Sequence, residues 1–264
     1  MQESAARWDE ICEDKDGHVV IKAMFLKSAA LSNLHPHQLE PVGAPPLQIP
    51  YPTSDGEVVV FNSSETAYQY AKAEYFEKRL RLKLNFTASF MVQNFPPTGI
   101  GPFEAKKRGG KCNFLNYIRK GSAHPITISE AKKLYDTIER GIPDDPNPED
   151  NWFASSKSVM EKILRIKFSA LNPMFVELLK RTGTRKIYEQ KFRSGSVWER
   201  QGCITDNKES WGWMGELLVQ IRADNNENMS TKCQMEREWK EKVATATMSH
   251  EDINYLERQR AFPR

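Results

Sequence analysis

The chain has 264 residues, of which 39% are hydrophobic and 28% are charged. This composition excludes a disordered chain and is sufficient for a sizeable core, in one large domain or two small ones. The 38 basic and 35 acidic residues give a formal net charge of +3. So small an excess does not by itself predict a nucleic-acid groove, but it is compatible with a local basic patch for a small anion.

The sequence also lacks the usual signals for membranes, secretion and metals. It has no run of about 18 apolar residues, and its first residues include acids and no apolar core, so neither a membrane span nor a secretory signal is predicted. Its four cysteines are far apart, which favours free thiols, and its five histidines show no metal-ligand spacing. We therefore expect a soluble protein of the cytoplasm or nucleus that uses no metal and no cofactor.

The first half of the chain predicts short strands followed by a long helix. Residues 1–18 are polar, and strands are predicted at 19–25 and 58–61. The prolines of 41–52 predict an extended loop, and Asp55-Gly56 predicts a turn. A helix is predicted at 64–82, with Ser63 or Ser64 as its N-cap.

The second half is richer in helix signals. Residues 94–121 contain many Pro, Gly, Lys and Arg residues and include a basic, glycine-containing loop at 105–111. Helices are predicted at 129–140, 152–171, 174–181 and 213–222, an acidic linker at 144–150 and a strand at 186–189. The pattern predicts an α+β fold: one helix-rich domain over 19–223 with a few short strands, between a flexible N-terminus at 1–18 and a polar, partly helical extension at 224–264.

Polar residues fall on the apolar side of the first long helix. Because a helix advances by about 100° per residue, Glu65, Gln69 and Lys72 share one side. That side also carries Tyr68, Tyr75, Phe76 and Leu80. The opposite side, predicted to face solvent, carries Glu74, Glu77 and Lys78. Burying an isolated charge costs several kcal/mol, so the pattern indicates a structural Glu65–Lys72 ion pair, a lysine that reaches solvent along its stem, or an active site.

The helix predicted at 152–171 has a similar feature. Its apolar face is formed by Met160, Ile163, Leu164 and Leu171. Lys167 lies among these residues, while Lys162 and Arg165 lie outside them. The amine of Lys167 either reaches solvent or faces a bound anion.

Several short blocks follow one another in an order typical of one protein family. The first blocks are Phe25 with Ser32-Asn33-Leu34, and then Ser64-Glu65-Thr66-Ala67-Tyr68-Gln69-Tyr70-Ala71-Lys72-Ala73. The later blocks are Ala105-Lys106, Trp152…Met160…Lys167-Phe168, Leu178-Leu179…Thr182-Gly183 with Glu189, and 215–222. Together they resemble the NADAR family, also called the YbiA-like or riboflavin-intermediate N-glycosidases. The resemblance covers about residues 22–223 and implies a YbiA-like fold.

The chain departs from the family pattern at several positions. The family usually has His and Tyr after the motif glutamate, where this chain has Thr66 and Ala67. It also has an Asp shortly before a Trp-Gly pair, which is missing before Trp198, and an Asn where Gly212 stands. Asp206 or Asn207 in the adjacent loop would have to substitute. These departures leave the substrate open.

The resemblance implies an N-glycosidase acting on a base joined to a phosphorylated ribose. Its substrate would be an early riboflavin intermediate, or ADP-ribose on a guanine, free or attached to nucleic acid. Glu65 and Lys72 would be the catalytic residues. Glu65 would act as an anion beside an oxocarbenium-like centre or as a proton carrier. Lys72 would form a Schiff base with the opened sugar, or else pair with Glu65 or hold a ribose oxygen or phosphate.

A larger set would bind the substrate: Asn33, Tyr68, Gln69, Lys106, Arg108, Trp152, Lys167, Glu189 and Trp198. Asn33 would bond a ribose hydroxyl or a base edge, or act as a turn residue. The cations of the 105–111 loop would clamp a phosphate, or form an exposed basic loop. The two tryptophans would stack on a base, although Trp152 suits the core as well.

Two other functions are compatible with the same residues. One is a non-catalytic module that binds ADP-ribose or another nucleotide, and the other is an interaction protein that keeps only the fold. Neither requires a membrane, and the sequence leaves the oligomeric state open.

Overall fold

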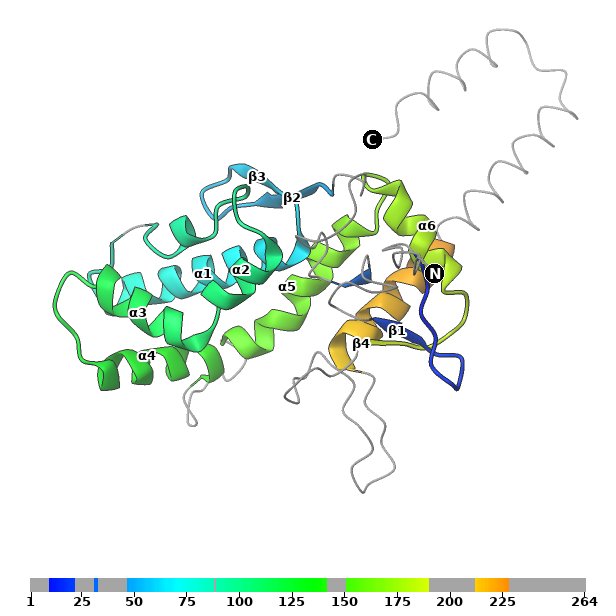
Figure 1. Ribbon diagram of the computed structural model, residues 1–264. Helices are drawn as coiled ribbons and strands as arrows, with labels where there is room; N and C mark the ends of the chain where they lie inside the picture. The colour runs from blue at the N-terminus through cyan, green and yellow to red at the C-terminus, as the bar shows by residue number, and fades with distance from the viewer. Residues whose placement is uncertain are drawn as a thin grey trace, which may run out of the picture. The chain divides into compact units, whose positions relative to one another are not determined.

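The computed structural model describes residues 10–21, 31–32, 47–87, 89–141, 151–189 and 212–227. The chain divides into two compact units, residues 1–221 and 222–264. The elements described below belong to the first unit (Figure 1), and in the second, residues 222–227 are helical. Short strands accompany a larger set of helices, which confirms the predicted helix-rich α+β class.

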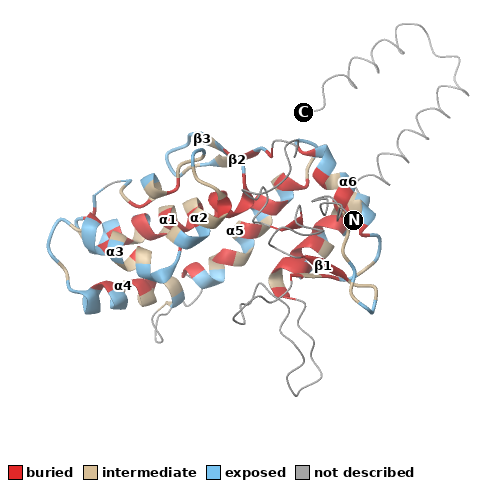
Figure 2. Cartoon of the chain, in the orientation of Figure 1, coloured by how far each residue is buried: buried red, intermediate tan, exposed pale blue. Residues whose placement is uncertain are grey.

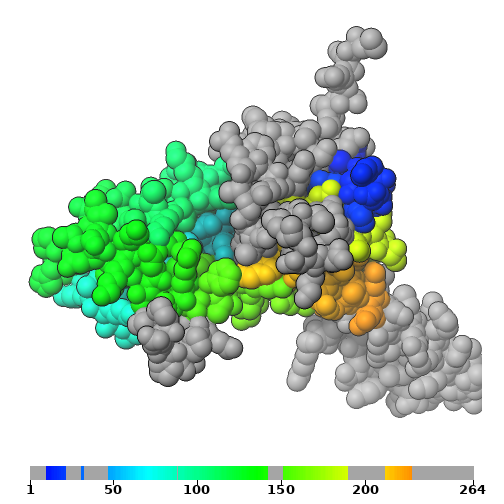
Figure 3. Space-filling model, turned by 90° about the horizontal axis from the view of Figure 1, so that it is seen from below, coloured from blue at the N-terminus to red at the C-terminus, as the bar shows by residue number. Residues whose placement is uncertain are grey.

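Two pairs of short strands join distant and neighbouring parts of the chain. β1 (Val19–Ile21) pairs in parallel with β4 (Ile187–Glu189), so that Val19 lies opposite Ile187. Figure 3 shows the blue N-terminal residues beside yellow-green ones, as this pairing requires. β2 (Ile49–Pro52) and β3 (Val58–Phe61) form an antiparallel hairpin. The prediction of a loop at 41–52 was therefore wrong for residues 49–52, which form β2. Prolines are tolerated in this strand because both strands of a two-stranded sheet are edge strands.

The helix α1 (Ser64–Lys83) is the element that carries the predicted site. The side chain of Ser63 caps it by accepting a hydrogen bond from the Thr66 backbone N–H at 3.1 Å. α1 packs against α2 (Pro102–Arg108) and α5 (Trp152–Lys167). Figure 2 shows much of α1 and α5 in the buried colour, and Glu65, Gln69 and Lys72 are all buried. The prediction that their face of α1 points inward is confirmed.

Glu77 corrects the predicted solvent face of α1. It is only 2% exposed, and its carboxylate accepts backbone N–H groups of Met91 and Val92, the latter at 3.0 Å. The carboxylate thereby holds η2 (Val92–Asn94), a short 3-10 helix, against α1. Spacing along α1 could not indicate this, because the covering segment comes from later in the chain.

The basic stretch predicted as a loop is mostly helical. α2 begins with Pro102 in its first turn, and Gly109 ends it. Gly110 caps α3 (Lys111–Gly121), so only these two glycines separate the helices. Lys106 and Arg108 therefore lie in the last turn of a helix, where cations are favoured by the negative end of the helix dipole.

The next helices begin at clear capping residues. α4 (Ile128–Arg140) starts with a capping box formed by Thr127 and Glu130, and it packs against α3 and α5. α5 starts after Asn151, whose side chain accepts from the Ala154 N–H at 2.9 Å. It ends before the predicted residue 171, and Leu171, which was predicted to be on the apolar face, is 59% exposed. α6 (Pro173–Arg181) follows with proline in its first turn.

Residues 212–221 form the last described helix of the first unit. Its residues Met214, Leu217, Leu218 and Ile221 are buried, as predicted. Gly215 approaches β4 so closely that a Cβ there would lie 2.0 Å from the Ile187 carbonyl oxygen. Within the described ranges, none of the helices is long and apolar enough to span a membrane.

Candidate functional site

The first turns of α1 bury a carboxylate next to a carboxamide. Glu65 is 2% exposed, and its Oε1 accepts a hydrogen bond from Gln69 Nε2 at 2.8 Å. Burial raises the pKa of the Glu65 carboxyl, while the cations of Lys106 and Lys72 and the bond from Gln69 oppose that rise. The proton affinity of Glu65 thus depends on nearby cations. A carboxyl of this kind can stabilise a positive charge when it is ionised, or transfer a proton when it is not.

Gly109 is required where the end of α2 meets Gln69. A Cβ at Gly109 would lie 1.8 Å from Gln69 Oε1, and this oxygen is buried and accepts no hydrogen bond from the part of the chain that the structure describes. The backbone of Gly109 has φ −72° and ψ −6°, which any residue can adopt. The glycine is therefore needed for the close approach and not for its backbone angles.

Substitution of Gly109 by alanine should push the carboxamide of Gln69 away from Glu65. We expect the variant to lose about 1–3 kcal/mol of unfolding free energy, as overpacked sites do. In a Gln69→Ala background the clash is absent, so Gly109→Ala should there be neutral or stabilising by up to about 1 kcal/mol. Urea denaturation of the single and double variants measures this coupling, and equal costs in both backgrounds would contradict the described contact.

Lys72, one turn further along α1, places its amine among groups from two other helices. Its Nζ donates to Tyr135 Oη at 3.1 Å, to Glu139 Oε1 at 3.5 Å and to the Gly109 carbonyl oxygen at 3.5 Å. Tyr135 Oη donates to the same Oε1 atom of Glu139. The amine also lies 4.8 Å from the centroid of the Phe114 ring. Three polar groups and an aromatic wall thus fix the position of one amine.

The environment of Lys72 shifts its proton affinity. Lys72 is 8% exposed, and burial lowers the pKa of its amine, an effect that Glu139 and, at longer range, Glu65 oppose. Burial and the bond to Glu139 also raise the pKa of the Tyr135 phenol, so this hydroxyl stays protonated. A neutral lysine amine is a nucleophile, whereas an ammonium is not.

The structure corrects the hypothesis of a direct Glu65–Lys72 ion pair. Among the described residues, the carboxylate within ion-pair distance of the Lys72 amine is that of Glu139, at 3.5 Å. Glu65 affects Lys72 electrostatically without such contact. The amine is therefore not sealed against the carboxylate that precedes it on α1.

A pocket lies beside this network. It has a volume of about 550 Å³, and its described lining residues are Glu139, Arg140, Asn151, Phe153 and Ala154. Glu139 belongs both to this lining and to the Lys72 network. The buried amine is thus linked to an accessible cavity by a single side chain.

Tyr135 and Glu139 were not singled out from the sequence. They lie one turn apart in a helix that was predicted, near its buried residues Ala131 and Ile138. This spacing could have marked them as an inward-facing polar pair. Nothing in the sequence indicates that the amine opposite them is Lys72 of α1.

The basic residues at the end of α2 have different surroundings. Arg108 Nε donates to Glu104 Oε1 at 2.9 Å and its Nη1 donates to the Asn94 carbonyl at 3.0 Å, so its guanidinium holds local structure. Lys111 pairs with Asp136 on α4. Lys106 is exposed and acts on Glu65 through its charge. Of the three, Lys106 is the one whose charge acts on Glu65.

The predicted aromatic residues near α1 are part of the core. Trp152 is buried, with its ring centroid 5.3 Å from that of Tyr68 and 5.6 Å from that of Tyr75. Burial raises the pKa of Tyr68, and the charge of Glu65 adds to this effect. Trp152 thus supports the face of α1 that carries Glu65.

Lys167 and Glu189 meet at a second buried polar cluster. Lys167 is fully buried, and its Nζ donates to the Ser32 backbone carbonyl at 2.6 Å. The hydroxyl of Ser32 donates to Glu189 Oε1 at 3.5 Å. Of the alternatives drawn from the sequence, burial excludes a Lys167 amine that reaches bulk solvent. Asn33 and Trp198, like Asp206 and Asn207, lie outside the described residues.

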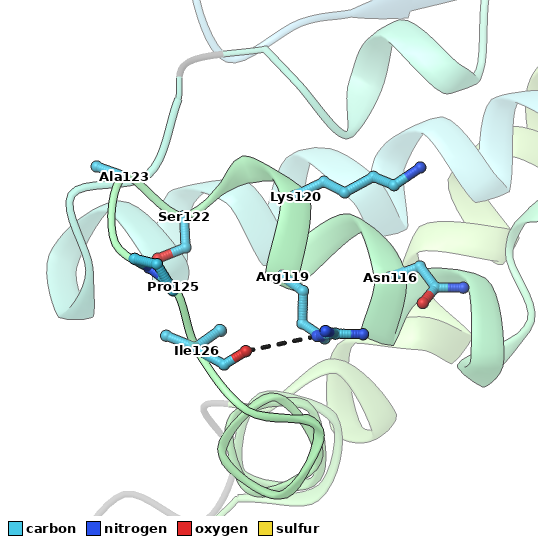
Figure 4. A pocket seen from close by; sticks show the side chains of 7 residues that line it. All are labelled: Asn116, Arg119, Lys120, Ser122, Ala123, Pro125 and Ile126. Carbon is cyan, nitrogen blue, oxygen red and sulfur yellow. Dashed lines mark hydrogen bonds between the residues drawn. The ribbon is translucent and has the colours of Figure 1, made fainter.

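Two other features of the described residues resemble sites, one an acidic turn and the other a pocket. Ligand atoms of Asp14, Asp16 and His18 lie within 4.8 Å of one another, but Asp14 already accepts the backbone N–H groups of both neighbours at 2.9 Å, which is typical of a self-stabilised turn. A pocket of about 440 Å³ lies at the α3–α4 connection (Figure 4). There, Arg119 Nε donates to the Ile126 carbonyl at 3.4 Å, while Lys120 points away from it. In the described residues, neither feature includes a hydrogen-bond partner of Lys72, whereas the pocket of about 550 Å³ includes Glu139, although its described lining contains neither Glu65 nor Lys72.

No family model and no curated protein matches this chain. The geometry of the site consists of a buried carboxylate, a buried amine with a lowered pKa, and a pocket reached through Glu139.

Proposed function

We propose that this protein is an N-glycosidase of the NADAR or YbiA-like type, which cleaves the bond between a base and a phosphorylated ribose or ADP-ribose. The observation that carries the proposal is the buried Lys72 amine, which donates to Tyr135 and to Glu139, and the side chain of Glu139 in turn lines a pocket. The order of the short sequence blocks supports the same family. The pocket volume of about 550 Å³ suits a small-molecule site or one nucleotide unit of a larger substrate.

Lys72 supplies the nucleophile in this proposal. Its neutral amine donates its electron pair to the anomeric carbon, and the base leaves with the electron pair of the glycosidic bond and takes up a proton. Opening of the sugar ring, with protonation of the ring oxygen, then gives an imine between Lys72 and the sugar. Water adds to this imine, releases the sugar and restores the amine.

Glu65 assists this reaction from two turns earlier in α1. Positive charge develops at the anomeric carbon as the base leaves, and a nearby carboxylate stabilises it. Lys106 and Lys72 favour the ionised form of Glu65 against the effect of burial. A substrate phosphate near Lys106 would complete the charge balance of the site.

A second candidate function is binding of ADP-ribose or a nucleotide without catalysis. Two of the family positions that differ here, Thr66 and Ala67, are fully buried and so unavailable to a substrate. The Thr66 hydroxyl lies 2.7 Å from the Ser63 hydroxyl at the helix cap, and Ala67 is fully buried. A chain that had lost catalytic groups at these positions would retain binding.

Product analysis by mass spectrometry distinguishes these functions. The full chain is incubated with an oligonucleotide carrying ADP-ribosyl guanine and, separately, with a phosphoribosyl intermediate of riboflavin synthesis. The proposal expects release of a free base or of free ADP-ribose from one of them, also in the presence of a chelator. Calorimetric binding without turnover would select the binding module, and absence of both would leave an interaction protein on this fold.

A further inference from the structure

Glu139 occupies the only described position that touches both the buried amine and the pocket. Its Oε1 accepts from Lys72 Nζ at 3.5 Å and from the Tyr135 hydroxyl, while its side chain is 23% exposed and lines the pocket. Lys72 and Tyr135 are each buried. Any proton that leaves the amine through the described hydrogen bonds toward the pocket therefore reaches the Glu139 carboxylate.

We propose that Glu139 takes the proton from the Lys72 ammonium and delivers it to the leaving base in the pocket. One transfer turns an ammonium and a carboxylate into a neutral amine and a neutral carboxylic acid, without any change in total charge. The amine becomes the nucleophile, and the acid faces the pocket. When the glycosidic bond breaks, the base takes the bonding electron pair and this proton, and the carboxylate is restored.

Such an exchange suits a site of this kind. In a poorly solvated environment an ion pair is less favoured relative to its neutral form than it is in water, because both charges lose hydration. Tyr135 keeps the acceptor in place, since its phenol donates to the same carboxylate oxygen. Tyr135 and Glu139 lie four residues apart on α4, so the helix itself brings their side chains into contact.

The other charged groups near the Lys72 amine do not link it to the pocket within the described residues. Within the described residues, Glu65 acts on Lys72 through its charge, and its carboxylate accepts a hydrogen bond from Gln69. Lys111 lies 5.0 Å from the centroid of the Tyr135 ring and pairs with Asp136. The charged and titratable groups around Lys72 on the helices that surround it are Glu65, Lys111, Tyr135, Asp136, Glu139 and Arg140. Of these, only Glu139 joins the amine to the pocket within the described residues.

The inference rests on the proposed function, and a leaving-group comparison tests it. Glu139→Gln should reduce release of a base that needs protonation by roughly 10²- to 10⁴-fold, the usual contribution of a general acid. The same variant should stay within about tenfold of the wild type on a ribose 5-phosphate with a 4-nitrophenoxy group, because 4-nitrophenolate departs without a proton and because loss of the Glu139 charge leaves more of the Lys72 amine neutral. Glu139→Asp, which keeps the carboxylate, should recover part of the base release.

An NMR titration provides a readout that needs no substrate. The ¹³Cε signal of Lys72, assigned with Lys72→Met, should titrate at lower pH in Glu139→Gln than in the wild type, because Glu139 favours the ammonium. The control Glu161→Gln removes an exposed carboxylate that pairs with Arg165 on α5, and it should leave the midpoint unchanged.

The outcomes separate this inference from the proposed function. Equal losses on both leaving groups, no loss on either, or an unchanged Lys72 midpoint would each overturn the role of Glu139. If the wild type releases nothing from any of the substrates, the glycosidase proposal fails. The titration then still decides whether Glu139 shares the proton of Lys72.

Discussion

Replacing Lys72 by methionine is expected to abolish base release and leave the fold intact. Methionine keeps most of the stem of the lysine side chain and its packing against Phe114, but it has no amine. Loss of the nucleophile should lower kcat by roughly 10⁴- to 10⁶-fold, as it does in other enzymes with a covalent intermediate. The measurement is a single-turnover assay of base release with circular dichroism and thermal unfolding in parallel.

The stability of this variant distinguishes catalysis from structure. Because burial lowers the pKa of Lys72, the wild type loses stability as the pH falls from the ordinary value of 10.5 toward that lowered pKa, where the loss levels off, and it regains this stability as the pH rises to 10.5 again. Lys72→Met removes this pH dependence and should change the unfolding free energy by less than about 1.5 kcal/mol, since Glu139 remains partly hydrated. A variant that unfolds would indicate that Lys72 mainly holds α1 and α4 together.

Glu65→Gln is the second substitution with a large expected effect. A glutamine in this place can still accept the hydrogen bond from Gln69, but it can neither carry a negative charge nor donate the proton of a carboxylic acid. Base release should fall by roughly 10²- to 10⁴-fold, the range expected for loss of one acid–base or charge-stabilising group. Wild-type rates in Glu65→Gln would exclude Glu65 from the reaction.

The pH dependence of stability gives an independent check on Glu65. Burial raises its pKa, so below the ordinary value of 4.5 the carboxyl is protonated in both the folded and unfolded chain. As the pH rises above that value, the unfolded chain loses the proton first, and stability decreases until the folded carboxyl ionises. Glu65→Gln should lack this decrease, which urea denaturation at several pH values measures, and an identical slope in both proteins would contradict the raised pKa.

The fold could be predicted from the sequence where the signals are local. The inward face of α1 followed from spacing alone, and the buried side of 212–221 followed in the same way. The short helix α2 was missed because its many Lys and Gly residues suggested a loop. Its Gly101-Pro102 start and its Gly109 end were nevertheless the usual signals for helix boundaries.

The site could be predicted only in part, because contacts between helices are not local. Spacing placed Glu65, Gln69 and Lys72 on one face, but it could not show that Lys72 reaches Tyr135 and Glu139 on α4. It also placed Glu77 in solvent, although Glu77 holds the chain after α1. In both cases the partner lies many residues away in the sequence, and the spacing of residues within one helix cannot predict such a contact.

The central claim is that Lys72 forms a covalent bond with the sugar during turnover. The most direct test is borohydride reduction during steady turnover of the full chain, followed by peptide mass spectrometry. The predicted result is a reduced sugar adduct on the peptide that contains Lys72, with the base already lost, and no adduct in Lys72→Met. An active wild type that yields no adduct, or an adduct on a different lysine, would contradict the claim.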